Sequence, residues 1–290
     1  MKEEMAVINS SQKMPTYQDD DGAISIKTFG SDKNRSVVFI HGWPDDDGLW
    51  DKYIDAMSHR WYCVVVRLPN FGSSLDTRRG HSVIQLADML HNTLDSIGLT
   101  ESEFDLVIHD WGAVIGYCYE RKYRGVRKIV ALDIGPTFEK SIKNIVLITS
   151  YQTPLVFSWW IGKVLPIAGN WLARLTAFGC GIRGNIKRVT WDMSYLYYFY
   201  LRDNTLSLFN KKYALASGVP DCPVCFMYGS ESPIAFFTNE WIENIEKSGG
   251  VSKAIPGDHW FLHSHFDEVL PLIETFLTTE KPDNVLKFAL

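Results

Sequence analysis

Short apolar runs alternate with helical patterns along most of the chain. Runs that are typical of buried strands occupy residues 23–28, 36–40, 62–66, 104–108, 128–133, 223–229 and 251–255. Between several of them, apolar residues recur at helical spacing, for example at Val83, Leu86, Leu90 and Leu94. Strands that alternate with helices predict an α/β fold with a mostly parallel central sheet flanked by helices. The turn sequence GSDKN between the first two runs predicts, in addition, that these two form a hairpin.

The alternation stops after Pro136 and resumes only toward the C-terminus. Residues 137–216 carry no clear run typical of a buried strand, and they are rich in Trp, Tyr and Leu in helical patterns. We therefore expect a helical cap over 137–216, inserted into an α/β core made of 1–136 and 217–290. The apolar segment 145–162 is interrupted by polar residues and proline, and a lone span inside a core insertion is implausible. No integral membrane span is therefore expected.

The composition is that of an ordinary globular protein. The 290 residues are 46% apolar and 22% charged, which suits one large domain with an insertion. A net charge of −5 without any Lys/Arg-rich run argues against a nucleic-acid partner. Five cysteines without framework spacing, and a start that lacks the apolar segment of a secretory signal, favour a reducing, cytoplasmic location. Cys222 and Cys225 lie in a segment typical of a buried strand, so we expect core thiols rather than a metal or redox site.

The sequence FDLVIHDWGAVIG, residues 104–116, joins a buried strand directly to an apolar helix through a sharp turn. This is the layout of a nucleophile elbow, a strained turn that lifts one reactive side chain above a parallel sheet. Asp110 occupies the raised position, Gly112 follows where bulk would clash, and Ile108 stands where a second small residue is usual. Taken alone, Asp110 fits a helix N-cap better, because Asp before an apolar helix is the commonest cap signal.

Other parts of the chain favour the catalytic interpretation of Asp110. His41, Asp133 and His259 each follow or end a predicted strand, so they fall at the strand ends where ligands gather in such sheets. A nucleophile, then an acid, then a histidine after the last strand is the chain order of the α/β hydrolases. At HGWP, VIHDWG, ALDIGP and GDHW the chain resembles that superfamily, in the branch with an Asp nucleophile that contains epoxide hydrolases and haloalkane dehalogenases.

The resemblance implies a hydrolase that forms a transient ester. Asp110 would attack an sp³ carbon of the substrate and displace an alkoxide or a halide, leaving an alkyl ester on the enzyme. His259 would then activate a water molecule that attacks the ester carbonyl. The backbone N–H groups of Trp43 and Trp111 would stabilise the oxyanion, and both side chains would contact the substrate. No cofactor or metal is needed, the expected partners are a small lipophilic substrate and water, and the oligomeric state is not predicted.

Two residues compete for the role of the acid that orients His259. The commoner position in the superfamily holds Ser232 here, whose hydroxyl cannot stabilise an imidazolium as a carboxylate does. Some members of the branch place the acid after the sixth strand instead, where Asp133 stands. We therefore expect Asp133, with Glu231 beside Ser232 as the alternative.

The leaving group separates the two activities of this branch. An epoxide oxygen needs a proton donor, and epoxide hydrolases present two cap tyrosines for this purpose. The segment Ser150–Gln152 resembles the one that supplies the first, which makes Tyr151 the candidate donor and Gln152 a substrate contact. The resemblance favours Tyr198 as the second donor, in preference to Tyr195, Tyr197 and Tyr200. Tyrosine is also a common filler of helical packing.

Two alternatives stay open. A haloalkane dehalogenase needs N–H donors for the halide; Trp111 fits one of them, Trp43 replaces the usual Asn, and the missing donor would be one of Trp159, Trp160, Trp171 and Trp191. A non-catalytic small-molecule receptor on the same fold is the alternative of a different class, because a fold does not fix a function. Of the remaining histidines, His41 is expected to brace the oxyanion loop, and His109 is expected to pack away from the site.

Overall fold

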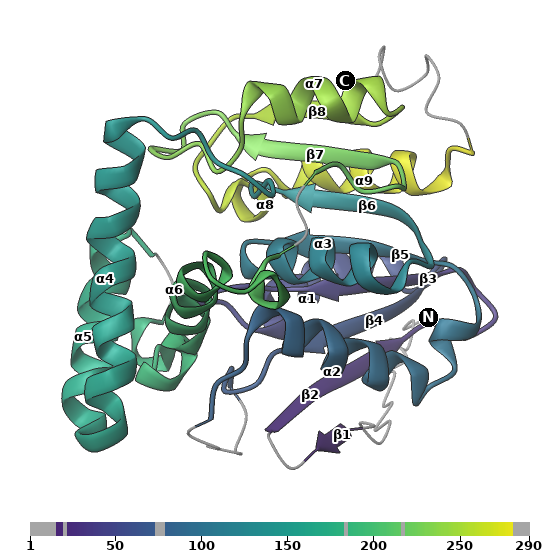
Figure 1. The fold of residues 1–290 in the computed structure, drawn as a ribbon. Coiled ribbons are helices and arrows are strands. Elements are labelled where there is room, and N and C mark those ends of the chain that lie inside the picture. Colours follow the sequence, from purple (N-terminus) through teal and green to yellow (C-terminus); the bar gives the residue numbers. More distant parts are fainter. Residues whose placement is uncertain (1–15, 20–21, 73–78, 183–184, 216–217, 281–290) are drawn as a thin grey trace, which may run out of the picture.

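An eight-stranded sheet forms the centre of the protein in a computed structural model that describes residues 16–19, 22–72, 79–182, 185–215 and 218–280 (Figure 1). Its strands lie in the order β1, β2, β4, β3, β5, β6, β7, β8. β2 is antiparallel to both of its neighbours, and every neighbouring pair from β4 to β8 is parallel, so the predicted fold class is confirmed. The strand bounds are β1 Thr16–Asp19, β2 Gly22–Phe29, β3 Ser36–Ile40, β4 Tyr62–Arg67, β5 Phe104–His109, β6 Val126–Leu132, β7 Val224–Gly229 and β8 Val251–Ile255.

The predicted hairpin of the first two long runs is wrong. β2 pairs with β4, with Ile26 opposite Val66, and β3 lies on the other side of β4, with Val38 opposite Val64. β3 is almost entirely buried on both faces, so its place is in the interior of the sheet, between the parallel neighbours β4 and β5. The sequence GSDKN therefore turns the chain without pairing the two strands that it joins.

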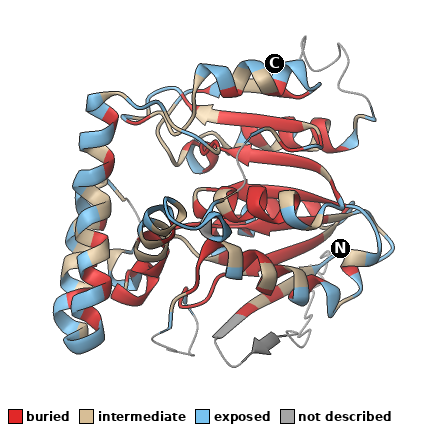
Figure 2. Cartoon of the chain, viewed as in Figure 1, coloured by how far each residue is buried: buried red, intermediate tan, exposed pale blue. Residues whose placement is uncertain are grey.

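Helices cover both faces of the sheet, in which the strands β3 to β7 are buried along most of their length (Figure 2). α2, α3 and α7 pack on the face that carries Val224 and Phe226, and α1 and α9 pack on the face that carries Cys225 and Met227. Cys225, and Cys222 just before β7, are buried free thiols, as predicted. The helix bounds are α1 Asp51–Met57, α2 Val83–Asp95, α3 Trp111–Tyr123, α7 Asn239–Lys247 and α9 Phe266–Thr278.

Between β6 and β7 the described residues form helices and turns without a strand. The helices α4 Ile142–Val164, α5 Pro166–Gly179 and α6 Tyr195–Ser207 lie beyond the carboxyl ends of the parallel strands (Figure 1). α4 and α5 pack side by side, and the glycines Gly162 and Gly169 let their backbones approach closely. A Cβ on Gly169 would lie only 2.6 Å from the Cα of Gly162. None of the helices in the described residues is both long and apolar enough to cross a membrane. The limits 137–216 of the cap stay a prediction.

The C-terminal helix is interrupted, whereas the sequence predicts one continuous helix over 263–277. The short helix α8 Phe261–Ser264 ends at His265, whose backbone is not helical (φ −121°, ψ 37°), and α9 begins at the next residue. Leu262 and Val269 are fully buried on either side of the break. The apolar residues therefore continue across the break at His265, and the sequence pattern does not predict the break.

Candidate active site

Asp110 lies on a strained turn between β5 and α3. Its backbone (φ 52°, ψ −122°) is outside the regions that residues with a side chain favour. The turn packs tightly against the loop after β3: a Cβ on Gly112 would lie 2.2 Å from the carbonyl oxygen of Ile40, and a Cβ on Gly42 would lie 2.2 Å from Oδ1 of Asp110. The Asp110 side chain makes no N-cap hydrogen bond. The local geometry is therefore that of a nucleophile elbow and not that of an N-cap.

His259, in the loop after β8, lies between two carboxylates. Its Nδ1 is 2.6 Å from Oδ2 of Asp133, and its Nε2 is 3.6 Å from Oδ2 of Asp110. Because an ionised carboxylate can only accept a hydrogen bond, Nδ1 carries a proton and Nε2 is the nitrogen that faces Asp110. The other oxygen of Asp133 accepts a hydrogen bond from the backbone N–H of Gly229 at 3.0 Å. The fold thus brings Asp110, His259 and Asp133 together, whereas the alternative acid, Glu231, is exposed.

Burial and neighbouring charges act in opposite directions on the two facing groups. Burial raises the pKa of Asp110 to about 6, although the charge of His259 and the backbone N–H groups of Trp111 and Trp43 lower it. Burial opposes a charge on His259 as well, but the hydrogen bond and the charge of Asp133, with the charge of Asp110, raise its pKa to about 9. Any reaction that neutralises Asp110 removes one of these charges and lowers the pKa of His259.

Two backbone N–H groups donate to the Asp110 carboxylate. The N–H of Trp43 donates to Oδ1 at 2.7 Å, and the N–H of Trp111 donates to the same carboxylate. The peptide bond between Trp43 and Pro44 is cis. Both N–H groups lie beside the carboxyl carbon, which is where an oxyanion on that carbon would need donors.

Two further histidines hold the loops of the site. His41 braces the loop after β3, as predicted: its Nδ1 donates to the carbonyl oxygen of Gly42 at 3.0 Å, and its Nε2 accepts from the N–H of Leu68 at 3.1 Å. His109 was expected to pack away from the site, but its Nε2 lies 3.1 Å from the backbone carbonyl oxygen of His259. The two imidazole rings are 4.5 Å apart. The alternation of side chains along a strand predicts only which face of the sheet His109 lies on. It cannot predict that the loop after β8 folds over His109 on that face.

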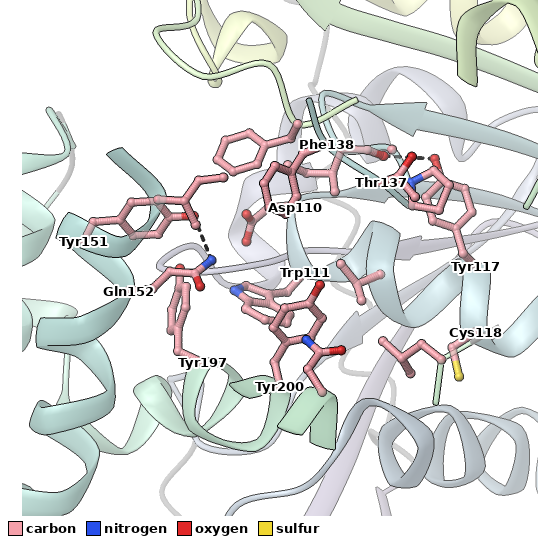
Figure 3. Close-up of a pocket in the computed structure, with 18 residues that line it drawn as sticks. Asp110, Trp111, Tyr117, Cys118, Thr137, Phe138, Tyr151, Gln152, Tyr197 and Tyr200 are labelled. Carbon is pink, nitrogen blue, oxygen red and sulfur yellow. Dashed lines mark hydrogen bonds between the residues drawn. The ribbon is translucent and has the colours of Figure 1, made fainter. Parts of the chain in front are cut away.

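Two cavities meet at Asp110. One of about 660 Å³ extends along α4 and α5, and one of about 300 Å³ extends toward α3 and α6 (Figure 3). The residues that line both are Asp110, Tyr151, Tyr197 and Phe236. Of the other predicted site residues, the larger cavity is lined by Trp43 and His259, and the smaller by Trp111 and Gln152. Cavities of this size with few polar groups are typical of small-molecule sites.

Four tyrosines line the cavities: Tyr117 and Tyr200 line the smaller one, and Tyr151 and Tyr197 line both. The Tyr151 hydroxyl accepts a hydrogen bond from Nε2 of Gln152 at 3.2 Å (Figure 3), and the side chain of Trp111 is hydrogen-bonded to Tyr197. Burial, with the charge of Asp110, holds the pKa of both phenols above the usual range, so both keep their O–H. The ring of Tyr198, which the sequence favours as the second donor, packs against Trp159 and Trp160 and lines neither cavity. Five of the six residues 195–200 are aromatic, so the sequence has no polar face that would indicate which tyrosines of this helix point to the cavity.

The indole N–H groups that a halide would need as hydrogen-bond donors are hydrogen-bonded to other residues, buried or away from the cavities. Trp111 is bonded to Tyr197, and Nε1 of Trp43 is buried without a partner among the described residues. The cap tryptophans line neither cavity; these are Trp159, Trp160, Trp171 and Trp191. The arrangement therefore offers two tyrosine O–H groups to a leaving group rather than two indole N–H groups.

Comparison with known proteins gives the same architecture. The model of a family described as the alpha/beta hydrolase family matches residues 37–272. The human mesoderm-specific transcript homolog protein is 25% identical over 240 residues, which are 75% of this chain and 68% of that protein. A crystal structure of Bacillus megaterium epoxide hydrolase with an inhibitor covers 91% of this chain and 100% of its own, at TM-score 0.66 and 19% identity. A crystal structure of the haloalkane dehalogenase DbeA from Bradyrhizobium elkani matches 91% of this chain and 97% of its own chain, at TM-score 0.63 and 17% identity.

Proposed function

Because the chain belongs to the alpha/beta hydrolase family, we propose that it hydrolyses an epoxide to a vicinal diol through an ester formed on Asp110. The observation that carries the proposal is the pair of tyrosine hydroxyls, on Tyr151 and Tyr197, that line the cavities beside the Asp110 carboxylate. Opening an epoxide needs a nucleophile at carbon and an O–H group at the ring oxygen at the same time. A halide leaves without a proton, so it has no use for these two hydroxyls.

In the first step, Oδ2 of Asp110 attacks a ring carbon and the bond from that carbon to the ring oxygen breaks. Oδ1 is held by the N–H of Trp43, which leaves Oδ2 as the oxygen for attack. The departing oxygen takes a proton from the hydroxyl of Tyr151 or Tyr197. The product is a hydroxyalkyl ester of Asp110, with one tyrosine left as its anion.

In the second step, Nε2 of His259 takes a proton from water and the hydroxide attacks the carboxyl carbon of Asp110. The backbone N–H groups of Trp43 and Trp111 stabilise the oxyanion, which collapses and releases the diol oxygen with the proton from His259. Asp110 keeps the oxygen of the water as a carboxylic acid, and its proton returns through solvent to the tyrosine anion. Ester formation has by then removed the Asp110 charge, which lowers the pKa of His259 and so increases the fraction of His259 that is neutral and can accept the proton.

The finer parts of the proposal rest on the site and on composition. The acid is Asp133, the oxyanion donors are Trp43 and Trp111, and the apolar cavity suits a small lipophilic substrate with water as co-substrate. A reducing, cytoplasmic location is supported by the five cysteines, all free thiols in the described residues. The ester route uses no cofactor.

An isotope experiment tests the route directly. In a single turnover of an aryl epoxide in ¹⁸O-water with excess enzyme, the diol is expected to carry no ¹⁸O, and the peptide that contains Asp110 is expected to gain one atom. Direct attack of water on the epoxide puts the label in the diol and overturns the ester route. Asp110→Ala serves as the blank.

The alternatives give different products. A bromoalkane that releases bromide while the epoxide stays intact favours a dehalogenase. Tight binding of an aryl epoxide by calorimetry, with neither diol nor bromide formed, favours a non-catalytic receptor.

A further inference from the structure

The outer surface of the α4–α5 pair is unusually apolar. Ile167 is 88% exposed, Val164 is 79% exposed and Trp171 is 66% exposed. We call this surface the α4–α5 face, and its large apolar residues are Ile142, Ile145, Val146, Phe157, Trp160, Ile161, Val164, Leu165, Ile167, Trp171, Leu175 and Phe178. Among the described residues outside the cap, Phe29 at 36% is the only exposed apolar side chain of comparable size. Exposed apolar area on this scale marks a surface that meets something else.

The exposed positions follow the helical repeat. On α5, Ile167, Trp171, Leu175 and Phe178 recur at intervals of three and four residues, while Ala173 on the other side is buried. On α4 the same spacing connects Phe157, Trp160 and Val164, while Trp159 and Gly162 face inward. Each helix therefore has one face packed within the protein and one apolar face left outward, at the margin of the molecule (Figure 2).

Charge on this part of the chain has the opposite sign to the rest. Between residues 140 and 191 the sequence has seven basic residues, Lys140, Lys143, Lys163, Arg174, Arg183, Lys187 and Arg188, and no Asp or Glu. The whole chain carries −5, so the remainder carries −12. Apolar helices with Trp and Phe that are accompanied by basic residues alone are typical of segments that lie in the interface of a bilayer with anionic lipids.

The larger cavity reaches the same surface. Leu172, Leu175 and Thr176 of α5 line it together with Leu147 and Pro154 of α4. Leu175 is also half exposed. The helix pair thus bounds the space that leads to Asp110 and also carries the α4–α5 face, and Leu175 belongs to both.

We propose that the α4–α5 face lies on an anionic lipid surface, with α4 and α5 resting on the bilayer and not crossing it. A second copy of the chain is a poorer occupant, because a symmetric contact through this face would bring two basic segments together and neither segment contains an Asp or Glu. On a bilayer, the apolar side chains enter the acyl boundary while the lysines meet anionic headgroups. A lipophilic substrate could then pass from the bilayer into the larger cavity, a consequence that rests on the proposed function.

Sedimentation with vesicles tests the proposal. The full chain is expected to pellet with phosphatidylcholine vesicles that contain phosphatidylserine, and Ile167→Ser with Trp171→Ser is expected to weaken this binding by at least about tenfold. Both positions are mostly exposed, so we expect the variant to keep the wild-type melting temperature; Phe29→Ser is the apolar control. Lys140→Glu with Lys143→Glu is expected to weaken binding to the anionic vesicles, whereas Lys33→Glu with Lys247→Glu is expected to have little effect.

Two outcomes overturn the proposal. One is a wild-type chain that stays in the supernatant at excess anionic lipid. The other is a dimer, measured by analytical ultracentrifugation without lipid, that the Ile167→Ser, Trp171→Ser variant abolishes, because the face would then join two copies. The readout needs no catalysis: Asp110→Asn is expected to bind vesicles like the wild type, so a failure of the proposed reaction leaves this test intact.

Discussion

Nδ1 of His259 and Oδ2 of Asp133 lie 2.6 Å apart, although 126 residues separate them in the sequence. The contact sets the tautomer of the ring and places Nε2 toward Asp110, 3.6 Å away. Together with the charges of Asp110 and Asp45, this contact outweighs the burial that disfavours a charged ring, since the pKa of His259 is raised to about 9. Asp133 therefore orients the ring and also contributes to stabilising its charge.

Asp133→Asn is expected to slow ester hydrolysis more than ester formation. The amide keeps the size of the side chain but loses the charge that stabilises an imidazolium, and comparable changes cost about 10⁴-fold in rate. Rapid quenching and mass spectrometry should therefore find the Asp110 ester accumulating during turnover. Glu231→Gln is the matched control, because Glu231 is exposed, and it should retain the wild-type rate. If Glu231→Gln instead slowed ester hydrolysis and Asp133→Asn kept the wild-type rate, Glu231 would be the acid.

Three tyrosine-to-phenylalanine changes should separate the proton donors from a packing residue next to one of them. Tyr197→Phe and Tyr151→Phe each remove an O–H at the cavities, and loss of one such donor typically costs roughly 10²-fold. Tyr198→Phe should change epoxide turnover little, since the Tyr198 ring packs on Trp159 and Trp160. Initial rates of diol formation check this. Slow turnover in Tyr198→Phe with normal turnover in Tyr197→Phe would restore the choice made from the sequence.

His109→Phe tests the hydrogen bond beneath the catalytic loop. The ring is replaced by one of similar shape, but the donor to the carbonyl oxygen of His259 is lost. A bond of this kind contributes about 1 kcal/mol, so we expect about a fivefold loss in the rate of ester hydrolysis. His109→Phe should leave the alkylation rate near wild type, because Asp110 is held by the loop after β3. Equal losses in both steps would mean that the substitution disturbs the elbow itself.

The pH dependence of the two steps should differ. Ester formation needs the Asp110 carboxylate, whose pKa is about 6, so its rate constant should rise with pH through about 6 and then level off. Ester hydrolysis needs neutral His259, whose pKa is about 9 while Asp110 is charged. The ester removes that charge, so the rising limb of hydrolysis should lie below pH 9. Stopped-flow tryptophan fluorescence measures both steps, and an alkylation rate that is flat around pH 6 contradicts the assignment.

The sequence predicted the interior strands because their residues are apolar on both faces, and it predicted Asp110 and His259 because strand order places them at one edge. It failed where the deciding contact lies between distant elements. GSDKN signals a turn, but only the burial of β3 on both faces decides that β4 lies between the two joined strands. Four tyrosines within 195–200 are equivalent in sequence, and only the docking of α6 on the core decides that Tyr197 and Tyr200 line the cavities at Asp110 whereas Tyr195 and Tyr198 do not. His109 is significant only because the loop after β8 folds over it.

Gly42→Ala should abolish activity through one methyl group. A Cβ at this position would lie 2.2 Å from Oδ1 of Asp110 and 2.5 Å from the backbone nitrogen of Trp111, closer than atoms can approach. The loop or the carboxylate must therefore move; overpacking of this kind costs about 1–3 kcal/mol. Because the same displacement takes Asp110 away from the N–H of Trp43, we expect a loss of at least about 10²-fold in turnover and a lower melting temperature. Gly179→Ala is the control for the melting temperature alone, since nothing lies within 4 Å of a Cβ there and α5 is helical at that residue, but Gly179 lines the larger cavity. A Gly42→Ala enzyme with normal turnover would show that the tight contact between the two loops is not needed to position the nucleophile.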